Sequence, residues 1–312
     1  MGAGRVPVIV GPTAVGKTAV ALALGALQPV EIVSADSRQV YRRLDIGTAK
    51  ATRRERKRVR HHGLDVVDPG QRYSAGRFAI EAARWIEEIR SRGALPVVVG
   101  GTGLYIRALS EGLFREPALN PTLRHDLQAW TALLPDSELV RWAGRLDPGF
   151  RGGGRQRAAR AIEVALLTGH PLSHWQQAAR ANGVIAPWYV LLSAPRPVLH
   201  RRIRQRAEEM VRRGLIEEVA AVLAEGHAPD APGLDAVGVR EAVQHLHGLR
   251  ERDSVAEAVT VSTRQYAKRQ ETWFRHQLRG PVLALDATRP AAELASEIMA
   301  AWKATGEGGE PG

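Results

Sequence analysis

The glycine-rich stretch at residues 11–18, GPTAVGKT, constrains the fold of this chain more than any other feature. It fills every fixed position of the pattern G-x-x-x-x-G-K-[ST]. A short apolar run at residues 6–10 precedes it, and good helix formers follow at residues 19–27. That order predicts a strand, a glycine loop and a helix. In such a loop the glycines let successive backbone N–H groups point at phosphate oxygens, at the positive end of the helix dipole.

The chemistry of the loop indicates a phosphate or diphosphate ligand but does not identify the molecule that carries it. Lys17 adds a mobile positive charge, and the Thr18 hydroxyl can hold Mg²⁺. The alternative is a glycine-containing turn that binds nothing, and the complete motif disfavours it. The expected diphosphate-binding residues are Gly11, Pro12, Thr13, Ala14, Val15, Gly16, Lys17 and Thr18.

The composition is that of an ordinary globular protein. The chain has 312 residues, of which 44% are hydrophobic and 25% charged, enough to bury a core in one large domain or two. It contains no cysteine, which excludes disulfides and thiolate metal sites and fits a reducing compartment. No apolar stretch reaches the length of a signal peptide or a membrane span. We therefore expect a cytoplasmic protein with no membrane partner.

The net charge of +11 is concentrated in four segments. Residues 53–62 carry +5, and residues 151–160, 201–213 and 264–279 carry +4 each, so the remaining chain carries −6. A basic surface confined to particular elements is typical of proteins that bind a polyanion. Any single run could instead be a solvated helix face. Four runs beside a phosphate loop favour the polyanion.

A carboxylate follows the second expected strand, at residues 30–33. That strand leads into Ser34-Ala35-Asp36-Ser37. At the carboxyl end of a parallel strand Asp36 would point into the crevice where such sheets bind ligands. A helix N-cap is an equally good explanation from position alone.

Glycines and a hydroxyl follow the next buried strand, expected at residues 95–99 after a helix that begins at Ser74. In many phosphate-loop hydrolases this strand ends in an aspartate that helps to hold Mg²⁺, whereas here it ends in Gly100-Gly101-Thr102. The missing carboxylate weakens a nucleotide-hydrolysis hypothesis. Thr102 is either a hydrogen-bonding group in the crevice or a helix N-cap, and the two roles are compatible.

The order of elements predicts an α/β fold, a P-loop NTPase-like parallel sheet flanked by helices, with a small all-helical insertion domain. Prolines and a Gly-Gly-Gly run interrupt the helical patterns of the insertion. Further strands are expected at residues 64–67, 188–192 and 282–285, and further helices at residues 197–213, 215–223 and 255–274. The predicted parts are a core at residues 1–116, the insertion at 117–183, the second part of the core with basic helices at 184–305, and a disordered tail at 306–312.

Five stretches of the chain resemble the tRNA dimethylallyltransferases (tRNA isopentenyltransferases). They are GPTAVGKT, SADSRQVYRRLDIGTAK at residues 34–50, VVVGGTGLY at 97–105, RQRAARAIEV at 155–164 and TRQYAKRQETWFR at 263–275. The first is generic, but DSRQVY, DIGTAK and GGTGLY together are highly specific. They occur in the family's order over nearly the whole chain.

This resemblance implies transfer of the dimethylallyl group from dimethylallyl diphosphate to the N6 amine of the adenine beside the anticodon (position 37) of tRNA. The loop and Mg²⁺ would hold the prenyl diphosphate, Asp36 would be the general base, and Thr102 would lie near the reacting groups. The partner would be the anticodon stem-loop, bound by a monomer. The expected tRNA contacts are Asp36, Ser37, Arg38, Gln39, Thr102, Arg124, Gln156, Arg157, Arg160, Arg240, Arg264, Lys268, Arg269 and Arg275.

One position departs from the family pattern, and three rival functions stay open. Family members usually carry Gly-Tyr where this chain has Gly238-Val239, so a role assigned to that phenol does not carry over. A nucleoside or nucleotide kinase would share the loop but would need ATP. A prenyltransferase acting on free adenine nucleotides would have little use for several basic elements. A non-enzymatic RNA-binding protein would leave the phosphate loop without a function.

Overall fold

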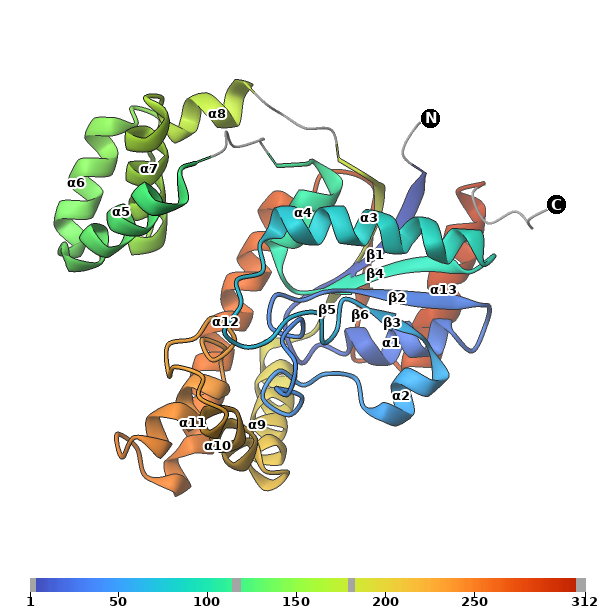
Figure 1. The fold of residues 1–312 in the computed structure, drawn as a ribbon. Helices are drawn as coiled ribbons and strands as arrows, with labels where there is room; N and C mark the ends of the chain where they lie inside the picture. The colour runs from blue at the N-terminus through green and yellow to red at the C-terminus, as the bar shows by residue number, and fades with distance from the viewer. Residues whose placement is uncertain (1–3, 114–118, 179–182, 307–312) are drawn as a thin grey trace. The chain divides into compact units, whose positions relative to one another are not determined.

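The computed structural model describes residues 4–113, 119–178 and 183–306 (Figure 1). The chain divides into two compact units, one of Met1–Ser110 with Val184–Gly312 and one of Glu111–Gly183. We call them the sheet unit and the helical unit. The sequence-based boundary at residues 116 and 117 and the tail beyond residue 306 lie outside the described residues. In the part of the chain that is described, no helix is long and apolar enough to cross a membrane.

The sheet unit contains six strands, all parallel, in the order β3-β2-β4-β1-β5-β6. Parallel neighbours need long crossover connections, which the helices provide. The strands are β1 Arg5–Val10, β2 Val30–Ala35, β3 His61–His62, β4 Leu95–Gly100, β5 Ala186–Ser193 and β6 Val282–Asp286.

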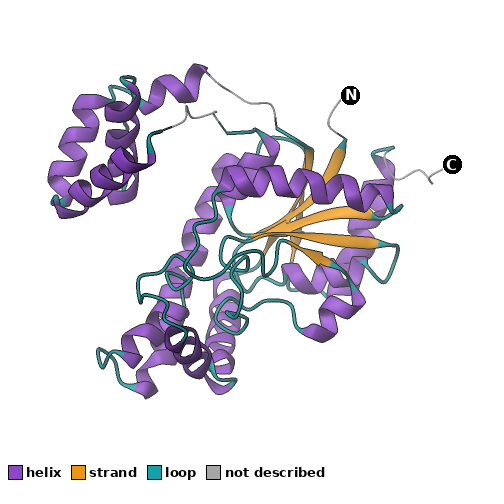
Figure 2. Cartoon of the chain, in the orientation of Figure 1, coloured by secondary structure: helices purple, strands orange, loops and turns teal. Residues whose placement is uncertain are grey.

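Helices cover both faces of this sheet (Figures 1 and 2). Helices α3 and α4 lie on one face, and α1 and α13 on the other, while α9 to α12 gather near the carboxyl ends of the strands. The bounds are α1 Lys17–Leu24, α2 Arg53–Arg58, α3 Ala75–Ser91, α4 Gly103–Ser110, α9 Arg196–Arg212, α10 Leu215–Ala224, α11 Val239–Leu246, the 3-10 helix η1 Arg252–Ser254, α12 Val255–Gln277 and α13 Ala291–Ala304.

Side-chain periodicity explains how the layers pack. Alternate strand residues such as Ile9, Val97 and Val99 join the core formed with α1 and α13, as the period of two in a strand requires. On α3 the buried residues recur at helical spacing, and Phe78 stacks on Tyr105 of α4 with ring centroids 4.4 Å apart. Both faces of the sheet are therefore apolar, which is typical of a parallel sheet.

The register of the three central strands brings their carboxyl ends together. Gly100 of β4 pairs with Val10 of β1 on one side and with Ala35 of β2 on the other. The segments that follow these residues therefore leave the sheet at the same edge. They are the glycine loop, the Asp36 turn and the Gly101-Thr102 turn.

Two details differ from the sequence-based expectations. The strand expected at residues 64–67 was wrong, because only Val67 forms an isolated bridge, with Tyr41, and the edge strand β3 lies at residues 61–62 instead. Helix α2 was missed because it buries none of its six residues and so has no apolar period. A capping box between Thr52 and Glu55 starts it.

Most other elements agree with the sequence-based expectations. Ser74 caps α3 by accepting the Arg77 N–H, and the strands expected at residues 95–99, 188–192 and 282–285 are confirmed. Helices α9, α10 and α12 begin and end within three residues of the expected limits.

The helical unit has a core of its own. Its helices are α5 Pro121–Leu133, α6 Asp136–Leu146, α7 Arg155–Thr168 and α8 Leu172–Ala178. Leu139 and Ala143 of α6 pack against Ala158, Ala161 and Ile162 of α7, and all five are fully buried. Small residues on both helices allow this close approach.

Candidate active site

The glycine loop has the backbone that a phosphate site requires. Gly11 and Gly16 have φ of 148° and 114°, in the region that favours glycine, and Ala14 is also left-handed at 63°. A Cβ on Gly11 would collide with the carbonyl oxygen of Leu192. Helix α1 then starts at Lys17, so its N-terminal N–H groups face the loop.

Lys17 lies over this loop. Its Nζ donates to the carbonyl oxygens of Gly11 and Pro12 at 2.8 and 2.9 Å. Burial lowers the pKa of Lys17 to about 8, with the nearby Asp36 carboxylate raising it and the Arg206 guanidinium lowering it further. A half-buried cation of this kind is stabilised by an anionic ligand.

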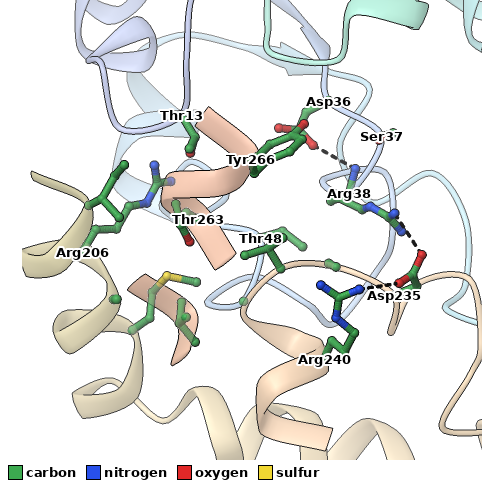
Figure 3. Close-up of a pocket in the computed structure, with 18 of the residues that line it drawn as sticks. Thr13, Asp36, Ser37, Arg38, Thr48, Arg206, Asp235, Arg240, Thr263 and Tyr266 are labelled. Atoms are coloured by element: carbon green, nitrogen blue, oxygen red, sulfur yellow. Dashed lines mark hydrogen bonds and ion pairs between the residues drawn. The ribbon is translucent and has the colours of Figure 1, made fainter. Parts of the chain in front are cut away.

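Asp36 follows β2 and caps a turn. Its Oδ1 accepts the Arg38 N–H at 2.8 Å, and residues 37–40 form a turn, so the helix N-cap alternative is wrong. The carboxylate lines the pocket shown in Figure 3. The crevice position expected from the strand end is confirmed.

Thr102 ties two of the three segments together. Its N–H donates to Ala35 O at 3.2 Å, and its Oγ1 accepts the Ser37 N–H at 3.0 Å. It also lies within hydrogen-bonding range of the Tyr266 hydroxyl, whose pKa burial raises to about 12. Thr102 therefore joins the end of β4 to the turn that contains Asp36 by hydrogen bonds.

Two adjoining cavities meet at these residues. The loop pocket, about 510 Å³, is lined by Gly16, Lys17 and Thr18, and the crevice pocket is about 290 Å³. Six residues line both cavities: Thr13, Asp36, Thr48, Ala49, Arg206 and Tyr266. A ligand on the loop and a second ligand in the crevice pocket would thus meet beside Asp36.

Arg206 is a site residue that the sequence analysis did not single out. It reaches the two pockets from α9, and burial lowers the pKa of its guanidinium while Asp36 raises it (Figure 3). The sequence held only a weak signal, namely its place between the apolar residues Ile203 and Ala207 in a run of six arginines.

The crevice pocket has an apolar wall and a charged mouth. Side chains on α9 and α12 form the apolar wall: Ile203, Ala207, Met210 and Val259. At the mouth Arg38 and Arg240 both pair with Asp235, at 3.4 and 3.6 Å (Figure 3). The Arg269 guanidinium lies over the Tyr266 ring, 5.8 Å from its centroid. Such a mouth suits a flat, negatively charged partner.

Gln39, expected at the tRNA, is held inside the protein. Its Oε1 accepts the Ser34 hydroxyl at 3.0 Å and its Nε2 donates to Thr48 O at 3.2 Å. It lines the loop pocket. Ser37 lies in the crevice pocket as expected, bonded to Thr102.

The basic residues of α12 that were expected to contact tRNA do not all lie at the same pocket. Of the expected residues, Arg269 lines the crevice pocket, together with Thr263 and Tyr266 of the same helix. Arg264, Lys268 and Arg275 are absent from the described lining of both pockets, and Arg275 borders another cavity, beside Pro12.

The DIGTAK segment at residues 45–50 is held by side chains of the sheet unit. Glu218 of α10 accepts the N–H groups of Asp45, Ile46 and Gly47 at 2.7–2.8 Å. Lys50 is fully buried and pairs with Asp45 at 2.9 Å. Val239 is buried against Gly47, and a Cβ at Gly47 would collide with it. These contacts place Thr48 and Ala49 in the two pockets.

In the helical unit two expected RNA contacts share a buried acid. Arg124 and Arg160 both pair with Glu163, the first at 3.1 Å, and Gln128 Nε2 donates to the same carboxylate at 2.8 Å. Gln156 and Arg157 are exposed on α7. Arg155 instead donates to carbonyl oxygens at the end of α5, so part of this basic run is structural.

Thr18 is the candidate magnesium contact. It is exposed and lines the loop pocket beside Lys17. No group of three acidic, His or Cys side chains able to hold a metal occurs in the described ranges. A cation here would therefore depend on the hydroxyl, the ligand's phosphates and water, as Mg²⁺ sites with phosphate ligands do.

Comparison with known proteins gives two family matches and close relatives. A model described as IPP transferase matches residues 39–277, and one described as isopentenyl transferase matches residues 4–68. A tRNA dimethylallyltransferase of Bordetella petrii is 41% identical over 306 residues, 94% of this chain and 97% of that protein. One of Halorhodospira halophila is 44% identical over 279 residues, 87% of this chain and 90% of that protein.

Two solved structures are similar over nearly the whole chain. The tRNA isopentenylpyrophosphate transferase of Bacillus halodurans has a TM-score of 0.70 and 32% identity, covering 97% of both chains. A eukaryotic dimethylallyltransferase acting on tRNA has a TM-score of 0.80 and 25% identity, covering 97% of this chain and 80% of that one. With the parallel sheet, these matches confirm the expected P-loop NTPase-like fold.

Proposed function

The chain belongs to the tRNA dimethylallyltransferase family, and we propose that it transfers the dimethylallyl group of dimethylallyl diphosphate to the N6 amine of the adenine beside the anticodon. The observation that supports this assignment most is the position of Asp36, which lines both the loop pocket and the crevice pocket. A diphosphate on the loop and an adenine in the crevice pocket would meet at this carboxylate.

Asp36 is the general base of the proposed reaction. The adenine amine is a poor nucleophile because its lone pair is delocalised into the ring. As the nitrogen bonds to C1 of the dimethylallyl group and the C1–oxygen bond breaks, the carboxylate accepts a proton from the amine. The Arg38 N–H, bonded to Oδ1, orients the carboxylate, and Thr102 holds the same turn through Ser37.

The cations of the loop pocket stabilise the leaving diphosphate. Negative charge develops on the bridging oxygen as the bond breaks, and loop N–H groups, Lys17 and Arg206 surround that region. The Thr18 hydroxyl would help to hold Mg²⁺, which would offset part of this charge when bound.

The other substrate is a tRNA whose adenine leaves the anticodon loop to enter the crevice pocket. Arg38, Arg240 and Arg269 at the mouth would bind the flanking backbone. Gln156 and Arg157, exposed on α7, would bind a further part of the RNA, along with the Arg124–Arg160 pair. We propose that a cytoplasmic monomer carries out the reaction, since one chain supplies both pockets.

The end of β4 argues against a kinase. A kinase built on this loop would use a carboxylate near Mg²⁺, and β4 leads instead into Gly101-Thr102. The transferase needs no nucleoside triphosphate, so the two functions make opposite predictions about ATP.

The direct test incubates the protein with labelled dimethylallyl diphosphate, Mg²⁺ and unmodified tRNA, without ATP. We expect label in the RNA, in N6-(dimethylallyl)adenosine after digestion, and none when a chelator is added. Lys17→Ala is the matched inactive variant, because it removes the charge nearest the leaving group. Phosphorylation of a nucleoside from ATP, with no labelled RNA, would contradict the proposal.

A further inference from the structure

Gln270 of α12 is a buried residue of the loop pocket whose side chain binds two backbone groups of the protein. Its side chain is 5% exposed and lies against the loop pocket. Its Oε1 accepts the Thr13 N–H at 2.8 Å, and its Nε2 donates to Gly101 O at 2.9 Å. One amide thus joins the glycine loop to the turn that follows β4.

An uncharged amide of this length makes both bonds, whereas an ionised carboxylate of the same length does not. The Thr13 N–H needs an acceptor and Gly101 O needs a donor, so an ionised carboxylate satisfies only the first. The fit is close as well, because a Cβ on Gly101 would collide with Nε2 of Gln270. The Gln270 amide consequently fixes the distance between the Thr13 N–H and the Gly101 carbonyl oxygen.

The two joined segments carry the two halves of the reaction. Thr13 belongs to the loop that would hold the diphosphate, and Gly101 precedes Thr102, whose hydroxyl holds the Ser37 N–H beside Asp36. One turn earlier on α12, the Tyr266 hydroxyl lies within hydrogen-bonding range of Thr102. The same helix therefore contacts both the leaving-group side and the base side.

We propose that Gln270 is a positioning residue, which fixes the diphosphate loop relative to the Gly101-Thr102 turn so that C1 of the dimethylallyl group, the amine and Asp36 align. This inference rests on the proposed function. Misplacement by about 1 Å costs on the order of 10²-fold in rate even when each substrate still binds. The effect of losing Gln270 should accordingly fall on kcat rather than on affinity.

The first test replaces the amide without a large change in volume. Gln270→Met removes both hydrogen bonds, and we expect kcat to fall about 10–100-fold. Affinity for dimethylallyl diphosphate, measured by calorimetry without tRNA, should change less than about threefold. A wild-type kcat in this variant would overturn the proposal.

The second test uses protonation to restore the donor. In Gln270→Glu the carboxylate accepts the Thr13 N–H but repels Gly101 O, whereas the protonated acid donates to it. Its activity relative to wild type should rise as pH falls from about 8 to about 5.5, because burial raises the pKa of a glutamate. Gln265→Glu, at an exposed position of the same helix, is the control and should follow the wild-type profile. A flat ratio for Gln270→Glu would contradict the positioning role.

Amide hydrogen exchange tests the connection that Gln270 makes between the glycine loop and the Gly101-Thr102 turn, without any transfer assay. In Gln270→Met we expect faster exchange in both segments, residues 11–16 and 100–103, with α13 unchanged. If wild type transferred no label, the proposed function would fail, and faster exchange in both segments would still support the link. Unchanged exchange in both would overturn it.

Discussion

The cations of the helical unit and those of the loop pocket are held in different ways. In the helical unit Arg124 and Arg160 share the buried carboxylate of Glu163. In the loop pocket Lys17 and Arg206 both lie near Asp36, and burial lowers the pKa of each cation. Two cations thus share one carboxylate in each region, by direct ion pairs in the helical unit and with desolvated cations in the loop pocket.

This contrast indicates what each region is built to do. Desolvating a cation without a full counter-charge is costly, so the loop pocket gains stability when a diphosphate enters it. The paired arginines of the helical unit stay partly exposed and are already in direct contact with the Glu163 carboxylate. We therefore expect crevice substitutions to change chemistry and helical-unit substitutions to change RNA affinity.

Of the substitutions that compare the two regions, Asp36→Asn should have the largest effect. Asp36→Asn keeps an oxygen for the Arg38 N–H but loses the basicity, so single-turnover transfer with both substrates saturating should slow by roughly 10²–10⁴-fold. The thermal melt should match wild type because the turn cap is retained. Normal transfer by a normally folded variant would remove Asp36 as the base.

A smaller loss is expected at Arg206. Arg206→Ala removes a half-buried charge beside the leaving group, and transfer should fall by about 10²–10³-fold. Arg204→Ala, exposed on the same helix, is the matched control and should stay within about twofold. Equal losses of transfer in the two variants would show that Arg206 has no specific role at the leaving group.

Substitutions in the helical unit should act on RNA affinity. Arg157→Ala and Arg160→Ala should each reduce the salt dependence of tRNA binding by about one unit for every phosphate that the arginine neutralises, with little change in turnover at saturating tRNA. Only Arg160→Ala should also lower the melting temperature, since Glu163 loses a partner. An unchanged salt slope in the double variant would place the RNA elsewhere.

The smallest effect on activity is expected at a neutralised cluster in the sheet unit. Glu31 accepts hydrogen bonds from Arg92 and bonds to His62, and these hold its pKa at about 2, below the ordinary 4.5. A lowered pKa means that its stabilisation is present above pH 4.5 and is lost as pH falls toward 2.

Glu31→Gln should accordingly lower stability at pH 7 by about 1–2 kcal/mol, after allowing for the partial exposure of Arg92. The difference from wild type should shrink in denaturant titrations below pH 4.5. Transfer per folded molecule should not change. A loss of transfer with normal stability would mean that this cluster also serves the reaction.

The sequence by itself determined the glycine loop, the main strands and the family. The loop pattern and the apolar periods are local, because each depends on residues a few positions apart. The same local reasoning missed α2 and placed a strand at residues 64–67, where burial gives no clean period. It also left Asp36 between a base and a cap, since a residue type alone does not show what lies opposite.

Tertiary structure alone decided which distant residues share the site. Pairing of Gly100 with both Val10 and Ala35 set three loops at one edge, and α9 and α12 then supplied Arg206 and Gln270. These contacts join positions as far apart as Thr13 and Gln270, 257 residues along the chain. Such pairings follow from packing of the whole core, and no spacing in the sequence records them.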